Sequence, residues 1–179
     1  MSKIILVRHG QAAASWGEET DPGLSETGRL QAASIQEALT PFVGAAILSS
    51  PKARAQETAC IALPGIQPSI DTRFTEIPSG DRSLADRGLW LRQVFRQHWS
   101  EQERQVKGWR EGILNALYEQ PDSIIFCHFV VINAVVSVAR NDDRVMQCRP
   151  DYCSMWEFEV TDQSIRLLKG GKEDESLVL

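Results

Sequence analysis

The sequence predicts an α/β domain with a mostly parallel sheet, because strand-like and helix-like segments alternate along the chain. Short apolar runs rich in branched residues occupy residues 3–8, 45–49 and 123–127, a pattern typical of buried strands. No internal repeat or low-complexity linker divides the chain. We therefore expect one domain over residues 1–169, followed by a loosely held tail over residues 170–179.

Turn residues and caps set the expected boundaries of the elements. Small and polar residues at 10–23 predict a loop, and Ser25 is a suitable N-cap for a helix that runs to about Leu39. Ser50 and Pro51 predict the cap and first turn of a helix that reaches residue 62. The remaining expected elements are a strand at 69–72, an irregular polar stretch at 76–88, a helical region at 89–118 broken near Gly108, a helix at 129–139, and a hairpin of strands at 155–160 and 164–168.

Composition restricts the classes of partner. The chain has 179 residues, of which 42% are hydrophobic and 24% charged, with a net charge of −5. A surface that binds nucleic acid or anionic lipid needs an excess of Lys and Arg, so we expect neither a nucleic-acid nor a membrane partner. A local cationic pocket remains compatible with this composition.

The N-terminus and the cysteines indicate a cytoplasmic protein. The apolar run at residues 4–7 is too short for a signal peptide or a membrane span. The four cysteines are widely spaced and form no CxxC pair, and the close pair Cys148 and Cys153 has no His nearby. We therefore expect reduced thiols and no metal site.

Charged residues cluster where the predicted strands end. Ligands of parallel α/β sheets bind outside the carboxyl ends of the strands. Arg8, His9 and Gly10 follow the first strand, Arg54 comes shortly after the second, and His128 follows the strand at 123–127. Each residue alone is more often structural, but their joint placement favours a functional site.

This set of residues suits phosphoryl transfer. Arginine offers planar, permanently charged donors that match a phosphate, and the helix start at Ser50-Pro51 would add backbone N–H groups. A histidine attacks phosphorus only when neutral, and neighbouring arginines would lower the pKa of His9 and keep it neutral. Gly10 would let the backbone approach the ligand closely.

Five segments in order resemble one family. Arg8-His9-Gly10 is followed by DPGLSETGRLQA at residues 21–32, SSPKARAQETA at 49–59, an acidic stretch at 74–77, and His128 after a strand within 124–138. Together they resemble the histidine phosphatase superfamily, which has the phosphoglycerate-mutase-like fold. The resemblance implies a three-layer sandwich, in which helices flank a mostly parallel central sheet.

The resemblance also implies roles for individual residues. His9 would be the nucleophile that forms a phosphohistidine, while Arg8, Arg54 and His128 would hold the phosphoryl oxygens. Glu76 would give a proton to the leaving oxygen and then activate water. The expected reaction is the hydrolysis of a phosphomonoester, with a small phosphorylated metabolite as its substrate. The reaction would need no metal or other cofactor.

Three departures from the family pattern leave alternatives open. Phe129 and Val130 follow His128 where relatives commonly have two glycines. The Phe129 N–H could still bind phosphate, unless this position requires a positive φ. Ser15 replaces a common Asn as a possible phosphate-binding residue, and the neighbouring Trp16 is either a packed anchor or a pocket wall. The stretch after Glu76 also differs, so Asp81 is the alternative acid.

The sequence contains further basic residues and is compatible with other functions. Arg92 and Arg96 are expected on a solvated helix face, with Leu91, Val94 and Phe95 on the packed face. Arg82 or Arg87 could meet a substrate, and His98 is expected to be exposed. The alternative functions are a phosphohistidine protein phosphatase, a phosphoglycerate-mutase-type phosphotransferase, and a non-catalytic phosphate-binding protein on the same fold. The sequence does not predict an oligomeric state.

Overall fold

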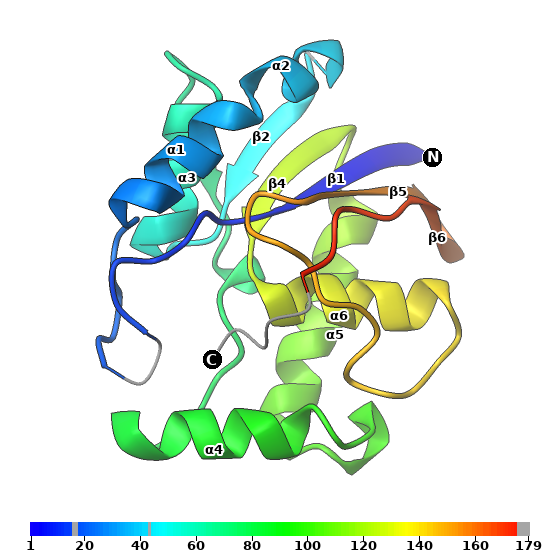
Figure 1. Cartoon of the computed structure of the whole chain (residues 1–179). Coiled ribbons are helices and arrows are strands. Elements are labelled where there is room, and N and C mark those ends of the chain that lie inside the picture. Colours follow the sequence, from blue (N-terminus) through cyan, green and yellow to red (C-terminus); the bar gives the residue numbers. More distant parts are fainter. Residues whose placement is uncertain (16–17, 43, 175–179) are drawn as a thin grey trace.

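A six-stranded sheet forms the centre of the fold (Figure 1). The computed structural model describes residues 1–15, 18–42 and 44–174. The strands are β1 Ser2–Arg8, β2 Ala46–Ser49, β3 Ser69–Ile70, β4 Ser123–Cys127, β5 Met155–Thr161 and β6 Ser164–Lys169, and they lie in the order β3-β2-β4-β1-β5-β6. Strands β1 to β4 pair in parallel, and the antiparallel hairpin of β5 and β6 adds to β1. The predicted mostly parallel sheet with a final hairpin is confirmed.

Helices cover both faces of this sheet and complete the expected three-layer sandwich. The α-helices of the structure are α1 Glu26–Ser34, α2 Gln36–Leu39, α3 Ala53–Ala62, α4 Leu84–Val94, α5 Arg104–Glu119 and α6 Phe129–Ala139. Side chains alternate along β1, so Ile4 and Leu6 pack with α5 and α6, whereas Ile5 and Val7 pack with α3. Figure 1 shows α1 and α3 on one side of the sheet, α5 and α6 on the other, and α4 apart from it.

The helical region expected at 89–118 is interrupted, but the predicted break near Gly108 is wrong. Helix α4 ends at Val94, a 3₁₀ turn covers Trp99–Glu101, and α5 continues through Gly108. The break lies where the backbone pairs with another loop. The Trp99 N–H donates to the Asp143 carbonyl, and the Gln97 carbonyl accepts from Val145. These bonds satisfy backbone groups that would otherwise continue a helix.

The helix after Ser25 is shorter than expected. Ser25 is its N-cap as predicted, since its hydroxyl accepts the Gly28 N–H at 3.0 Å. The helix does not run unbroken to Leu39, because α1 ends at Ser34 and the four-residue α2 follows. The Ser34 hydroxyl donates to the Gln31 carbonyl at 2.7 Å, a local bond of the kind that bends helices.

Helix α3 begins at Ala53 rather than at Pro51, so the prediction of Ser50 as its N-cap is wrong. Its N-cap position is Lys52. The Ser50 hydroxyl instead contacts His128 and accepts the Lys52 N–H at 3.2 Å. The Asp21 carboxylate, from a distant loop, accepts the Ala53 N–H at 3.0 Å and so caps the helix in place of Ser50.

The segment after β6 is held more firmly than predicted. The Lys172 carbonyl accepts the Asp151 N–H, and the Asp174 N–H donates to the Arg149 carbonyl, both at 2.9 Å. These bonds fix residues 172–174 against the loop before β5, while residues 175–179 lie outside the described part. The domain limit at residue 169 stays a prediction.

The cysteines are consistent with the expected reduced state. All four are free, and burial raises the pKa of Cys148 and Cys153 to about 12. These two thiols are therefore neutral and poorly reactive at pH 7. In the part of the chain that the structure describes, no helix is both long and apolar enough to cross a membrane.

Two glycines allow the chain after β1 to contact α1. A Cβ on Gly10 would lie 2.5 Å from the Gly28 carbonyl oxygen, and a Cβ on Gly28 would collide with the Gln11 carbonyl oxygen. Backbone rather than flexible side chain occupies the space in both cases. This contact fixes the loop that directly follows His9.

We expect Gly28→Ala to lower the free energy of unfolding by about 2 kcal/mol, because the added methyl group forces two backbone segments apart. Urea denaturation followed by circular dichroism measures the change. Gly108→Ala is the matched control. Nothing lies within 4 Å of its Cβ position, so the substitution should stabilise α5 by about 0.5–1 kcal/mol. Equal effects at both positions would contradict the proposed contact.

Candidate active site

Four of the predicted side chains, three expected at strand ends and Glu76 implied by the resemblance, meet in one buried cluster. His9 follows β1, His128 follows β4, Arg54 lies in the first turn of α3, and Glu76 follows a 3₁₀ turn at Thr72–Phe74. The order β2-β4-β1 places the three strand ends side by side. His9, Arg54 and His128 are at most 6% exposed, and the Glu76 side chain is 15% exposed.

The hydrogen bonds of His9 define its tautomer. Nδ1 lies 2.7 Å from the Gly10 carbonyl oxygen, which only accepts, so Nδ1 carries the proton. Arg54 Nε donates to Nε2 at 3.1 Å, so Nε2 presents a lone pair. The imidazole is therefore neutral and has its free nitrogen beside a guanidinium.

Arg54 connects the members of the cluster. Beyond its bond to His9, its Nη2 lies 3.3 Å from Glu76 Oε2 and 3.4 Å from His128 Nδ1. Its Nη1 lies 3.8 Å from Asp21 Oδ1, the same oxygen that caps α3. One guanidinium thus reaches four other segments of the chain, at His9, Asp21, Glu76 and His128.

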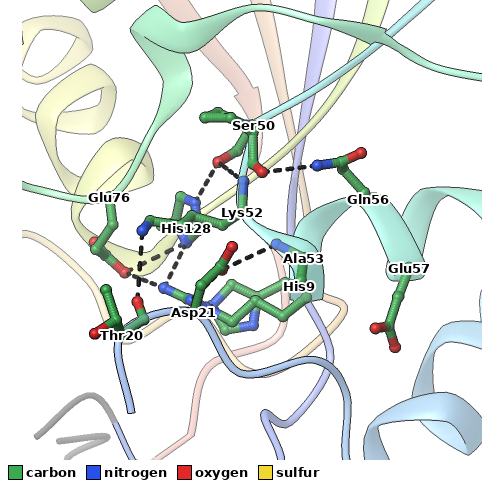
Figure 2. Close-up of polar contacts among 12 residues, drawn as sticks. His9, Thr20, Asp21, Ser50, Lys52, Ala53, Gln56, Glu57, Glu76 and His128 are labelled. Carbon is green, nitrogen blue, oxygen red and sulfur yellow. Dashed lines mark hydrogen bonds and ion pairs between the residues drawn. The ribbon is translucent and has the colours of Figure 1, made fainter.

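His128 is held from two sides. Its Nε2 lies 2.7 Å from the Ser50 hydroxyl, and its Nδ1 lies 3.3 Å from Glu76 Oε2. Figure 2 shows the Glu76 carboxylate directed towards His128, with Ser50 on the opposite side of the ring. The Ile77 N–H donates to the other Glu76 oxygen at 3.1 Å and fixes the carboxylate.

Arg8 is buried among aromatic rings. Its guanidinium lies 4.0 Å from the centroid of the Tyr152 ring and 5.3 Å from that of Phe129. Its Nη1 donates to the Pro150 carbonyl at 2.6 Å. These contacts hold a permanent charge that is only 1% exposed beside the histidine cluster.

The site offers donors without acceptors. Within the described residues, Arg8 Nε and Arg54 Nη1 are buried and have no hydrogen-bond partner. Helix α6 also begins at the site, with His128 at its N-cap position and no side-chain cap. Buried unpaired donors are costly, and helix N-termini attract anions. A cavity of about 310 Å³, lined by Arg8, His9, Arg54 and Glu76, could admit such an anion.

Burial and charge set the ionisation of the cluster. Burial, followed by the charges of Arg54, His128 and Arg8, holds the pKa of His9 well below its usual value. Burial also lowers the pKa of His128 and outweighs the opposing effect of Glu76. Burial alone would raise the pKa of Glu76, but the nearby His128 and Arg54 outweigh it and hold that pKa below its usual range. At pH 7 both histidines are neutral and Glu76 is ionised.

The same cluster contains a set of possible metal ligands. One donor atom each from His9, Glu76 and His128 lies within 4.8 Å of the others. Arg54 already donates to two of these residues, through Nε to His9 and through Nη2 to Glu76. A cation would have to displace this permanent charge, so the arrangement favours an anion.

Comparison with known proteins identifies the family. The sequence profile of the Histidine phosphatase superfamily (branch 1) matches residues 4–172. The chain belongs to this superfamily. Among curated proteins, no sequence gives a significant match.

Solved structures of other proteins share the fold. A mycobacterial glucosyl-3-phosphoglycerate phosphatase in complex with VO3 is 21% identical and has a TM-score of 0.72. The alignment covers 93% of this chain and 97% of the mycobacterial chain. YhfR of Bacillus stearothermophilus is 23% identical, covers 94% and 96%, and has a TM-score of 0.73. A phosphoglycerate mutase from Thermus thermophilus is 22% identical, covers 96% and 99%, and has a TM-score of 0.68. At these identities the likeness establishes the fold.

The three predicted phosphate-binding residues have different environments in this superfamily member. Gly10 is not among the cavity-lining residues. Its N–H donates to Thr58, and its missing side chain makes room for Gly28. Ser15 lines the cavity from an exposed position. Phe129 also lines the cavity and starts α6 without a positive φ, so replacement of the family glycine causes no backbone strain.

The alternative site residues lie elsewhere. Asp81 is exposed and does not line the cavity. Arg82 does not line it either, since its guanidinium pairs with Glu103 and donates to the Ser79 carbonyl. Arg87 is also absent from the cavity lining, and His98 is exposed, as predicted. Trp16 lies outside the described residues.

Sequence reasoning missed two neighbours of the cluster. Tyr152 lies in a loop with no periodic pattern, so nothing in the sequence connected it with Arg8. Ser50 was noticed only as a helix cap, although it follows β2 at the same edge of the sheet as His9 and His128. Its position at a strand end was the signal that could have assigned it to the site.

We expect the His9 imidazole to remain neutral at about pH 6.5, where a free histidine is half protonated, because burial and the charge of Arg54 hold its pKa well below the usual value. Two-dimensional ¹H–¹⁵N NMR of the imidazole nitrogens measures this, with His9→Gln used for assignment. A histidine peptide in the same buffers is the reference. Protonation of His9 near pH 6.5 would contradict the electrostatic description of the site.

Proposed function

We propose that the chain is a phosphatase that hydrolyses a phosphomonoester through a phosphohistidine at His9, without a metal. The observation that carries this proposal is the neutral His9 ring with its Nε2 lone pair beside Arg54. An imidazole in this state is a nucleophile, and the adjacent guanidinium would position and neutralise the phosphoryl group that it attacks.

In the first step, His9 Nε2 bonds to phosphorus as the bond to the leaving oxygen breaks. The unpaired Arg8 Nε and Arg54 Nη1 supply donors for the phosphoryl oxygens. The α6 N-terminus, which starts at Phe129, offers further N–H groups. His128 would donate to a phosphoryl oxygen after releasing Glu76.

Glu76 is proposed to give the leaving oxygen its proton and then to take one from water. Glu76 is ionised, because Arg54 and His128 contact it. A bound phosphate dianion would engage these groups and repel the carboxylate, which raises the pKa of Glu76. In the second step water bonds to phosphorus, the bond to Nε2 breaks, and inorganic phosphate leaves.

Hydrolysis rather than transfer is supported by the rest of the cavity. Arg8 and Arg54 are the only cationic residues among its described lining. A phosphorylated acceptor would need a second cationic subsite, which that lining does not provide. Among the fold relatives, the mycobacterial protein is a phosphatase, which agrees with this proposal.

We expect His9→Ala to reduce hydrolysis of p-nitrophenyl phosphate by about 1000-fold or more, because no other neutral nucleophile replaces Nε2. The matched control is His98→Ala, which removes an exposed histidine outside the cavity and should retain activity. Rapid acid quench with ³²P-labelled phosphate ester should trap an acid-labile phosphoenzyme only when His9 is present. Full activity of His9→Ala would refute the mechanism.

Glu76→Gln should lower kcat by about 100-fold or more on an alkyl phosphate, because an alkoxide leaves poorly without a proton. The loss should be smaller on p-nitrophenyl phosphate, whose leaving group needs little protonation. Asp81→Asn, at the exposed alternative acid, should leave both rates unchanged. Loss of activity in Asp81→Asn with Glu76→Gln intact would reverse the assignment.

A further inference from the structure

The cavity that contains His9 extends beyond the charged cluster into an apolar region. The alanines at residues 12–14 come from the loop after β1, Leu91 from α4, Phe95 from the C-cap position of α4, and Phe129 and Val130 from α6. The segment of α4 and its C-cap thus presents to the cavity the same Leu91 and Phe95 that the sequence predicts on a packed face. In a phosphatase the group beyond the phosphoryl site is the leaving alcohol, so this region would contact that alcohol.

Aromatic rings connect the two regions directly. The Phe129 ring lies 5.3 Å from the Arg8 guanidinium and 5.5 Å from the Phe95 ring, which is tilted by 49° against it. The Tyr152 ring contacts Arg8 and lies 6.3 Å from the His9 ring. An apolar or aromatic group attached to a bound phosphate would therefore meet rings immediately beside the phosphoryl site.

The charges of the lining disfavour a second anionic group. Arg8 and Arg54 are its only cationic members among the described residues, and both belong to the phosphoryl end. The anionic members are Glu76, which belongs to the phosphoryl end, and Glu18, whose Oε2 accepts the Ser15 N–H at 3.0 Å. A carboxylate or second phosphate on the substrate would meet no free cation there and would face a like charge.

The size of the cavity fits a small ring. Its volume is about 310 Å³, and a cavity of about 150 Å³ accommodates benzene. We propose, on the basis of the phosphatase function proposed above, that the substrate is a phosphomonoester of an aromatic alcohol that carries no second anionic group. Phe95 and Phe129 would hold its ring, while the negative charge of Glu18 would disfavour analogues that carry a second anionic group.

Three alkyl phosphates with similar leaving-group chemistry test this substrate class. Benzyl phosphate should have a kcat/KM at least about 10-fold above that of glycerol 1-phosphate, because its ring is removed from water. The kcat/KM of benzyl phosphate should also lie about 5-fold or more above that of 4-carboxybenzyl phosphate, which differs by one carboxylate. Equal values for the three esters would overturn the proposal and leave the phosphatase function intact.

Variants assign the selectivity to residues. Phe95→Ala should reduce the ratio of kcat/KM for benzyl over glycerol 1-phosphate by about 5-fold, since a face of the ring site is lost. Phe42→Ala removes the same group from the partly buried edge of the core outside this cavity and should keep the ratio. Glu18→Gln should raise kcat/KM for 4-carboxybenzyl phosphate relative to benzyl phosphate by about 2-fold or more. A ratio that Phe95→Ala leaves unchanged would contradict the proposed ring site.

A binding measurement separates the specificity from catalysis. Benzylphosphonate, which cannot be hydrolysed, should bind at least about 10-fold more tightly than methylphosphonate in isothermal titration calorimetry. Absence of hydrolysis for every ester together with this preference would refute the phosphatase function but support the ring site. Equal binding of the two phosphonates would refute the ring site, whether or not esters are hydrolysed.

Discussion

The contact between Arg54 Nε and His9 Nε2 is the interaction on which the rest of the site depends. It directs a permanent charge to the nitrogen that is proposed to attack phosphorus, and it keeps that nitrogen unprotonated. The same guanidinium contacts Glu76 and lies near His128, so its charge acts together with burial on the pKa values of all three groups. Because it is 3% exposed, water screens these effects weakly.

The fold explains how this contact forms between distant residues. Strands β2, β4 and β1 are neighbours in the sheet, so Ser50, His128 and His9 emerge from adjacent strand ends. Adjacent strands lie about 4.8 Å apart, which matches the 5.1 Å between the two histidine rings. Arg54 enters from the first turn of α3, whose start is fixed by Asp21. The central sheet therefore determines the spacing, and the segments that follow its strands bring the charged groups together.

The parts of this arrangement that the sequence predicted are those governed by local rules. Buried strands show as apolar runs, and the sheet topology then places His9 and His128 together without knowledge of any contact. Tyr152 could not be predicted in this way, because its role depends on a loop from another part of the chain meeting Arg8. The predicted position of the helix break is wrong for the same reason. Pairing of residues 97–99 with 143–145 outweighs local helix propensity and places the break before α5. The glycine at 108 looked locally disruptive, yet an exposed glycine costs a helix only about 1 kcal/mol.

The ionisation of Glu76 links binding to the proposed chemistry. Its carboxylate balances part of the charge of Arg54 and so offsets part of the cost of burying that guanidinium. When a phosphate dianion takes over that role, the carboxylate faces a like charge and becomes a better acceptor for a proton. After the alcohol leaves and the phosphoryl group is on His9, the surroundings again favour the ionised carboxylate, which is the form that can take a proton from water. One residue can therefore act first as an acid and then as a base, because the charge of its neighbour changes during the reaction.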